Sequence, residues 1–158
     1  AQFSIWNRSP ERAQSLAKTR TDARAVTDLK AAIGSADIIC TSTMSTSPLL
    51  QGSWLQEGQH VDLIGAYRPD MREADDQALQ RARVFVDSFG TTLAHIGALK
   101  IRLSSGALRR ADVQADYYSE RGFQRGSERD ITLFKNGGGA HLDLMTARYI
   151  LQQWRTAA

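Results

Sequence analysis

Polar residues and glycines follow the short apolar runs of this 158-residue chain, and they are the first candidates for chemistry. Ligands of open parallel sheets bind at the carboxyl ends of the strands, so the residues after each apolar run decide what is bound. Here those residues are rich in hydroxyl, amide and cationic groups and in glycine, at positions 7–9, 41–44, 65–68, 87–88 and 135–137. Such a set predicts a polar, phosphate-bearing ligand.

A metal site is not predicted, because no cluster of His, Cys, Asp and Glu has the spacing of metal ligands. His60, His95 and His141 fall in different predicted elements. For His60 and His141 a structural or exposed position is the favoured interpretation.

Composition and charge narrow the class of protein. The net charge of +3 arises from 20 basic and 17 acidic residues without long runs of one sign, so a nucleic-acid partner is not predicted. No apolar stretch approaches the roughly 18 residues of a membrane span. The lone cysteine, Cys40, cannot form an internal disulfide, which favours a cytoplasmic location, and its apolar neighbours predict a buried thiol.

The alternation of apolar runs with helical patterns is typical of βαβ units, so we expect one α/β domain over residues 1–158 with a doubly wound, mostly parallel sheet. Right-handed crossovers would connect its strands. The predicted strands are residues 3–6, 23–26, 37–42, 60–66, 84–87 and 130–135.

The predicted helices have recognisable starts or faces. Ser9 is a candidate N-cap before Pro10, and Asp70 with Glu73 predicts a capping box that opens a helix within residues 67–82. Further helices are expected at residues 10–17, 27–36, 91–99 and 111–122. In a final helix the apolar residues 140, 144, 147, 151 and 154 form a stripe expected to pack on the sheet.

Asn7-Arg8-Ser9 bears on the choice of nucleotide. An acidic residue after the second strand of a dinucleotide-binding fold bonds a free ribose 2′-hydroxyl, whereas an arginine beside a hydroxyl suits a 2′-phosphate. No carboxylate precedes Glu11, so in such a fold the segment favours NADP over NAD. The alternative is that Ser9 only caps a helix and Arg8 is a solvated surface residue.

A glycine-rich G-x-G-x-x-G turn should lie about 20 residues before Asn7 in that fold, but six residues precede it. We therefore expect a Rossmann-type sheet truncated before its first strand and its glycine-rich turn. The segment NGGGAH lacks the fingerprint spacing. We interpret it as a tight turn or close packing in preference to a phosphate cradle.

The chain resembles the ornithine cyclodeaminase/mu-crystallin family over nearly its whole length. The resemblance is carried, in family order, by IWNRSPERAQSLA, ADIICTSTMSTSPLL, WLQEGQHVDLIGA, RPDMREADDQAL, VFVDS and ITLFKNGGGAHLDLMTA. It implies a Rossmann domain that begins at its second strand, without the preceding segment that builds the substrate pocket and the interface of a homodimer.

The resemblance also implies roles for individual residues. Asn7, Arg8 and Ser9 would hold the adenosine ribose and its 2′-phosphate. Along the cofactor toward the nicotinamide, the implied contacts are Ser42, Thr43 and Met44, with Ile64 near the ring and Asn136 near its carboxamide.

Tyr67 stands where cyclodeaminases that expel ammonia carry an aspartate, and a phenol with a pKa near 10 is a poor base at pH 7. The substitution resembles the ketimine-reductase branch. It implies NADPH-dependent reduction of a small cyclic imino acid, Δ1-pyrroline-2-carboxylate or Δ1-piperideine-2-carboxylate, to L-proline or L-pipecolate. Arg68 is a candidate partner of the substrate carboxylate, and His95 a candidate general acid. An ammonia lyase and a non-catalytic or truncated binding protein remain alternatives.

Overall fold

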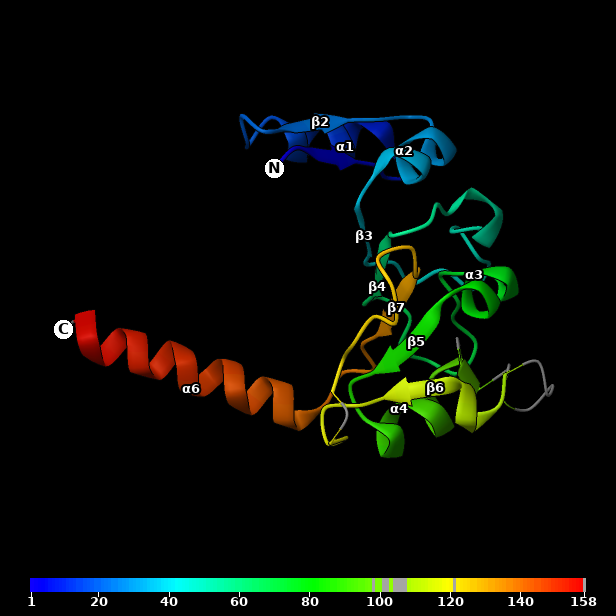
Figure 1. Ribbon diagram of the computed structural model, residues 1–158. Helices are drawn as coiled ribbons and strands as arrows, with labels where there is room; N and C mark the ends of the chain where they lie inside the picture. Colours follow the sequence, from blue (N-terminus) through cyan, green and yellow to red (C-terminus); the bar gives the residue numbers. More distant parts are fainter. Residues whose placement is uncertain (98, 101–102, 104–107, 121, 158) are drawn as a thin grey trace.

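A computed structural model describes residues 1–97, 99–100, 103, 108–120 and 122–157, and in this part of the chain the strands form two parallel sheets (Figure 1). The smaller sheet pairs β1 (Phe3–Ile5) with β2 (Ala23–Ala25). The larger has the order β3-β4-β7-β5-β6, with β3 (Ile38–Thr41), β4 (His60–Leu63), β5 (Arg83–Val86), β6 (Val113–Ala115) and β7 (Thr132–Lys135).

Helices connect most of these strands. They are α1 (Pro10–Ala17), α2 (Leu29–Ser35), α3 (Asp76–Arg81), α4 (Phe89–His95) and α6 (Ala140–Ala157), with 3₁₀ turns η1 (Gly52–Trp54) and η2 (Arg110–Asp112). The prediction of an α/β, mostly parallel, Rossmann-type sheet is confirmed.

One face of the larger sheet forms the core. Alternate strand residues point to the same face, and on this face Val61, Leu63, Val84, Val86 and Leu133 are at most 1% exposed. They belong to one apolar cluster with residues of α3 and α4, namely Ala78, Leu79 and Leu93. The opposite face is less covered: Ile38 and Cys40 of β3 are exposed and Asp62 of β4 is half-buried. The predicted burial of Cys40 is therefore wrong, because β3 is an edge strand of the larger sheet within the described residues and Cys40 lies on its open face.

The smaller sheet carries its own helix. Ala13 and Ala17 of α1 are buried, and this unit lies above β3 in Figure 1. Pro10 occupies the first turn of α1 and Ser9 the N-cap position, as predicted, but the Ser9 side chain makes no capping bond. Instead Asn7 Oδ1 accepts a hydrogen bond from the Ser9 N–H at 2.9 Å.

Two helix predictions are wrong. The helix expected from Asp70 begins only at Asp76, where Asp75 is the N-cap and accepts the Ala78 N–H at 2.9 Å. Residues 111–122 were expected to be helical, yet they contain η2 and the strand β6, in which Val113 and Ala115 are buried and Gln114 is exposed. Pairing with β5 overrides the local helical pattern.

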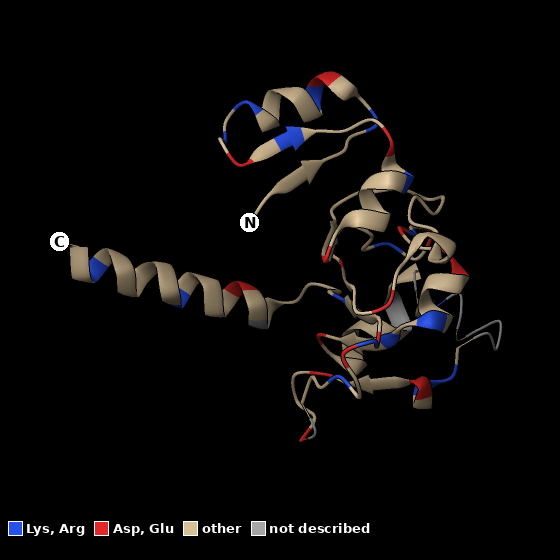
Figure 2. Ribbon diagram, turned by 45° about the horizontal axis from the view of Figure 1, so that its top comes forward, with Lys and Arg blue, Asp and Glu red and all other residues tan. Residues whose placement is uncertain are grey.

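The final helix forms, but its predicted packing is wrong. In α6 the side chains of Leu144, Leu151 and Trp154 are exposed, and the helix extends away from the sheet (Figure 1). The turn before it contains Gly138 with φ +73°, a left-handed backbone conformation that glycine adopts readily. No helix among the described residues is both long and apolar enough to cross a membrane. Basic and acidic residues are interspersed along the ribbon (Figure 2).

Two glycines provide a matched test of this packing. A β carbon on Gly52 would lie 2.3 Å from the Ala78 backbone nitrogen, whereas one on Gly34 would meet only the Trp54 carbonyl oxygen, at 3.8 Å. We expect Gly52→Ala to lower the free energy of unfolding by about 2 kcal/mol through overpacking. Gly34→Ala, within α2, should raise it by about 0.5 kcal/mol. Urea unfolding measures both, and equal stability of the two variants would contradict the packing of η1 on α3.

Candidate functional site

The carboxyl ends of β3, β4 and β7 lie side by side and form the candidate site. The Ile64 N–H donates to the Thr41 carbonyl at 2.9 Å, and the Asn136 N–H donates to the Leu63 carbonyl at 3.1 Å. These bonds continue the parallel ladder one residue beyond each strand. The carboxyl end of the sheet therefore brings together five candidate residues, namely Ser42, Thr43, Met44, Ile64 and Asn136.

Glu73 ties two of these strand ends together. Its side chain is 1% exposed, and Oε1 accepts the Thr43 N–H at 2.6 Å and the Thr43 hydroxyl at 2.9 Å. Oε2 accepts the N–H groups of Gly65 at 2.9 Å and Ala66 at 3.2 Å. The capping-box prediction for Glu73 is thus wrong, because its carboxylate satisfies backbone donors after β3 and β4 instead of a helix end.

Gly65 occupies a position that has no room for a side chain. A β carbon there would lie 2.1 Å from the Thr43 nitrogen, 2.2 Å from the Thr43 carbonyl oxygen and 2.6 Å from Glu73 Oε1. The backbone after β4 therefore runs directly against the backbone after β3. Beside this contact, Ile64 is 44% and Met44 is 69% exposed, so both strand ends present large apolar side chains to solvent.

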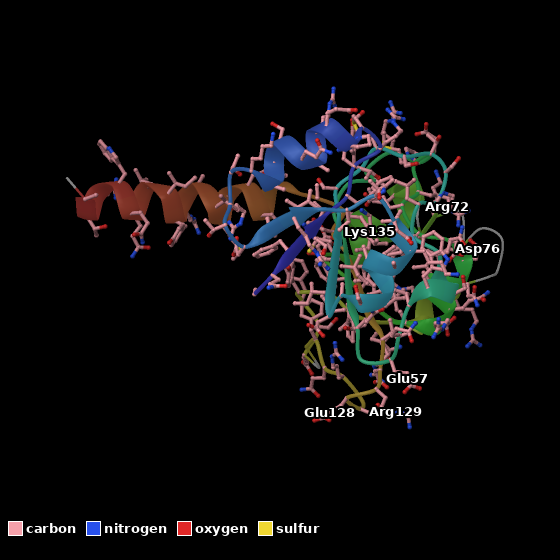
Figure 3. The ribbon with its side chains drawn as sticks, turned by 90° about the horizontal axis from the view of Figure 1, so that it is seen from above. Glu57, Arg72, Asp76, Glu128, Arg129 and Lys135 are labelled. Atoms are coloured by element: carbon pink, nitrogen blue, oxygen red, sulfur yellow. The ribbon has the colours of Figure 1, made fainter. Side chains whose placement is uncertain are left out.

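Lys135 is buried beneath these strand ends, at the end of β7 (Figure 3). Its Nζ donates a hydrogen bond to the Leu63 carbonyl at 3.0 Å. Burial lowers the pKa of Lys135 to about 8, and attraction by Glu73, Asp87 and Asp62 opposes this shift. The sequence placed Lys135 at a strand end without indicating that its charge lies inside the protein.

Asp87 and Gly137 join the β5 end to the turn after β7. Asp87 Oδ1 accepts hydrogen bonds from the Ser88 N–H and from the Thr92 hydroxyl. A β carbon on Gly137 would lie 2.2 Å from Thr92 Oγ1, so this glycine allows α4 to approach the turn. Next to it Asn136 Oδ1 accepts the Gly138 N–H at 2.8 Å. The close packing expected of NGGGAH is present at Gly137.

Asp116, which the sequence did not single out, fixes the start of α4. It is 6% exposed and accepts the Phe89 N–H at 2.9 Å, together with bonds from Ser119 and Tyr118. Burial would raise the pKa of Asp116, but these hydrogen bonds outweigh it and hold the pKa below its ordinary value. Asp116 directly follows the next strand, β6, so its bond to the start of α4 joins distant segments and no local sequence pattern indicates it.

Asn7, Arg8 and Ser9 follow β1 and so belong to the smaller sheet. The side chain of Arg8 is exposed, and Asn7 turns back to bond the backbone of Ser9. The structure thus distributes the predicted nucleotide contacts over two sheets, with Ser42, Thr43, Met44, Ile64 and Asn136 on the larger one.

The two candidate catalytic residues lie in segments that contact each other, because Gly97, two residues after His95, bonds the Arg68 carbonyl. Arg68, in the loop after β4, is exposed and pairs with Asp70 at 3.4 Å, and its carbonyl accepts the Gly97 N–H at 3.2 Å. Tyr67 precedes it and is 56% exposed. His95 is the last residue of α4, and its side chain lies outside the described residues.

A hollow lies on the open face of the larger sheet, away from the strand ends. It has a volume of about 460 Å³ and is lined by His60, Asp62, Phe85, Tyr117, Phe123, Gln124, Arg125, Thr132 and Phe134. His60 Nδ1 lies 2.8 Å from Thr132 Oγ1, and burial lowers the pKa of His60. The structural role expected for His60 agrees with this contact. No group of three metal-ligating side chains gathers anywhere in the described ranges.

A parallel α/β sheet with polar strand ends, a close backbone approach at Gly65 and buried charges beneath them defines a Rossmann-like nucleotide-binding domain. The family model of the ornithine cyclodeaminase/mu-crystallin family matches residues 1–158, and the chain belongs to that family.

The most similar relatives include named reductases. A Δ(1)-pyrroline-2-carboxylate reductase of Paracoccus denitrificans is 50% identical over 154 residues, covering 93% of this chain and 49% of that protein. A ketimine reductase mu-crystallin of Mus musculus is 35% identical over 95% of this chain and 46% of that protein. The structure of the Thermococcus litoralis Δ(1)-pyrroline-2-carboxylate reductase with NADH and L-proline matches with a TM-score of 0.86 and 25% identity, over 93% of this chain and 48% of that one. The chain therefore spans about half the length of these relatives.

The buried lysine makes the stability depend on pH. Because the pKa of Lys135 falls from 10.5 to about 8 on folding, the folded protein loses this proton at lower pH than the unfolded chain. Unfolding then takes up a proton between pH 8 and 10.5, so the Lys135 contribution to the free energy of unfolding rises with pH, by up to about 3 kcal/mol.

Denaturant unfolding between pH 7.5 and 9.5 measures this effect against Lys135→Gln, which keeps an N–H donor for the Leu63 carbonyl but does not titrate. The stability difference between the original chain and the variant should move in favour of the original as pH rises. Parallel curves would show that the lysine titrates normally.

Proposed function

We propose that this chain is the nicotinamide-nucleotide-binding part of an enzyme that reduces a cyclic ketimine carboxylate, with NADPH as the preferred reductant. The observation that carries the proposal is the 50% identity to a Δ(1)-pyrroline-2-carboxylate reductase over 93% of the chain. The substrate would be Δ1-pyrroline-2-carboxylate or Δ1-piperideine-2-carboxylate, and the product L-proline or L-pipecolate.

The residues at the strand ends fit a nicotinamide. Met44 and Ile64 are large, apolar and exposed at adjacent strand ends, which suits one face of a planar ring. Gly65 lets two backbones approach closely, and the half-buried Asn136 side chain offers amide groups for a carboxamide. Ser42 and Thr43 would line the path toward the ribose. A bound reduced nicotinamide supplies the hydride that adds to the imine carbon, and the protein's contribution is to orient the ring and exclude water.

The adenosine end would be held by Asn7, Arg8 and Ser9. The exposed Arg8 guanidinium can form charge-assisted hydrogen bonds to a 2′-phosphate, and no carboxylate before Glu11 would repel it. This supports NADPH over NADH. The Thermococcus litoralis relative, in contrast, was solved in complex with NADH.

The loop after β4 supports reduction over ammonia release. Tyr67 stands in the position of the aspartate that the cyclodeaminases use, and it offers an exposed phenol in place of that carboxylate. Arg68 would attract the substrate carboxylate in competition with Asp70, and His95 would share a proton with the imine nitrogen.

Residues 1–158 would form the cofactor-binding domain of a longer arrangement. Within the described residues β1 pairs only with β2, and β3 only with β4, so each of these strands has an unpaired edge. A further parallel strand between β1 and β3 would join the two sheets in the order of a Rossmann domain. We expect the full-length protein to be a cytoplasmic homodimer.

The cofactor preference is tested with Arg8→Ala. Loss of a charge-assisted bond should weaken NADPH binding roughly tenfold to a hundredfold and leave NADH binding unchanged. Lys18→Ala removes the same charge at the other end of α1 and serves as the control. Titration calorimetry with both cofactors gives the dissociation constants. Equal affinity of the original chain for NADPH and NADH would contradict the 2′-phosphate proposal.

The reaction is tested in a chimera in which this chain replaces the matching 154 residues of the Paracoccus reductase. We expect oxidation of NADPH on addition of Δ1-pyrroline-2-carboxylate and no ammonia from L-ornithine, because Tyr67 cannot act as the carboxylate base. Tyr67→Asp in the same chimera should reduce the rate of imine reduction. Substantial ammonia release by the unmodified chimera would favour the lyase alternative, and NADPH binding without turnover of either substrate would favour a binding protein.

A further inference from the structure

Glu73 is a buried carboxylate that accepts hydrogen bonds from four donors. The donors are the N–H groups of Thr43, Gly65 and Ala66 and the hydroxyl of Thr43, at 2.6 to 3.2 Å. Two of them bond Oε1 and two bond Oε2. Since an ionised carboxylate only accepts hydrogen bonds, it satisfies all four donors at once.

A neutral amide of the same shape cannot do this. If the NH₂ group of a glutamine pointed at Gly65 and Ala66, it would face two backbone N–H groups. If it pointed at Thr43, the hydroxyl could rotate to accept, but the Thr43 N–H would still meet a donor. Either orientation leaves at least one backbone N–H without an acceptor in a buried place, which is costly.

The segment that carries Glu73 is held rigidly by its backbone. The Glu73 carbonyl accepts the N–H groups of Leu49 and Leu50, both at 2.9 Å. The Arg72 N–H donates to the Ser45 carbonyl at 2.7 Å, and Ala74 forms a β-bridge with Leu50. The guanidinium of Arg72 in turn contacts Asp76 in the first turn of α3 (Figure 3). The backbone that carries the Glu73 carboxylate is therefore held in place, and from there the side chain reaches both strand ends.

The negative charge of Glu73 is balanced by the buried cation Lys135. Lys135 is attracted to Glu73, as well as to Asp87 and Asp62, and is itself anchored to the Leu63 carbonyl. Leu63 ends β4, and Ile64 and Gly65 follow directly. The lysine and the glutamate thus bond the same strand end from two sides, one through a carbonyl and the other through N–H groups.

We propose that Glu73 is a positioning residue for the nicotinamide end of the site, acting through Thr43, Gly65 and Ala66. By holding the backbones after β3 and β4 together, it sets the separation of Met44 and Ile64, the apolar side chains that would face the ring. Glu73 would not itself touch the cofactor. This inference rests on the proposed function, which assigns the nicotinamide ring to the ends of β3 and β4.

The test compares Glu73→Gln with Asp75→Asn in the 158-residue chain. Asp75 is a fair control, because its Oδ1 alone accepts both the Gly52 and the Ala78 N–H, and an asparagine oxygen can replace it. Dissociation constants for NADPH, melting temperatures, and amide hydrogen exchange by NMR are measured for each. For Glu73→Gln we expect about tenfold weaker NADPH binding and about tenfold faster exchange at Thr43, Gly65 and Ala66, at a temperature where the variant is folded. Asp75→Asn should leave both unchanged.

Thr43→Val provides a milder second variant in case Glu73→Gln does not fold. It removes the hydroxyl bond to Glu73 and should speed exchange at Gly65 and Ala66, which it does not touch. Because Thr43 is itself a proposed cofactor contact, the readout of this variant is amide exchange at Gly65 and Ala66 and not NADPH affinity.

Unchanged NADPH affinity in Glu73→Gln would overturn the positioning role. Unchanged amide exchange would overturn the link itself. If the original chain fails to bind NADPH, the proposed function fails and the positioning role with it, whereas the exchange data still report separately whether Glu73 holds the two strand ends.

Discussion

The contact between the ends of β3 and β4 depends on one buried negative charge. Parallel strands end with backbone N–H groups that the ladder no longer pairs, and burying them without acceptors would be unfavourable. Glu73 supplies acceptors for three such groups in a place where Gly65 allows the backbones to touch. The apolar core lies beneath this contact, and the exposed side chains of Met44 and Ile64 lie above it. Lys135, on the adjoining strand β7, bonds the end of β4.

Local signals in the sequence were sufficient for the class of fold and for the position of several strand ends. Apolar runs bounded by polar residues located most strands, and residues 42–44 and 136 follow strand ends as expected, whereas Ile64 was expected within a strand and lies just after one. Pro10 marked the start of α1 because its ring suits a first helical turn. These features depend only on neighbours along the chain.

The features that the sequence did not reveal depend on contacts between distant segments. Glu73 lies 30 residues from Thr43, so the spacing that resembled a capping box carried no information about its real partners. β6 has only three residues and gains its conformation by pairing with β5. The stripe of α6 satisfied the helical period, yet the helix extends away from the sheet and its apolar side chains are exposed.

The division into two sheets has a consequence for how a dinucleotide would be bound. Its adenosine end and its nicotinamide end would meet groups carried on separate hydrogen-bonded units, Asn7 to Ser9 on one and the ends of β3, β4 and β7 on the other. Because the two ends of the dinucleotide are covalently joined, binding of one end to its unit raises the local concentration of the other end at the second unit. Any strand that locks the units together raises affinity without adding a single contact to the ligand.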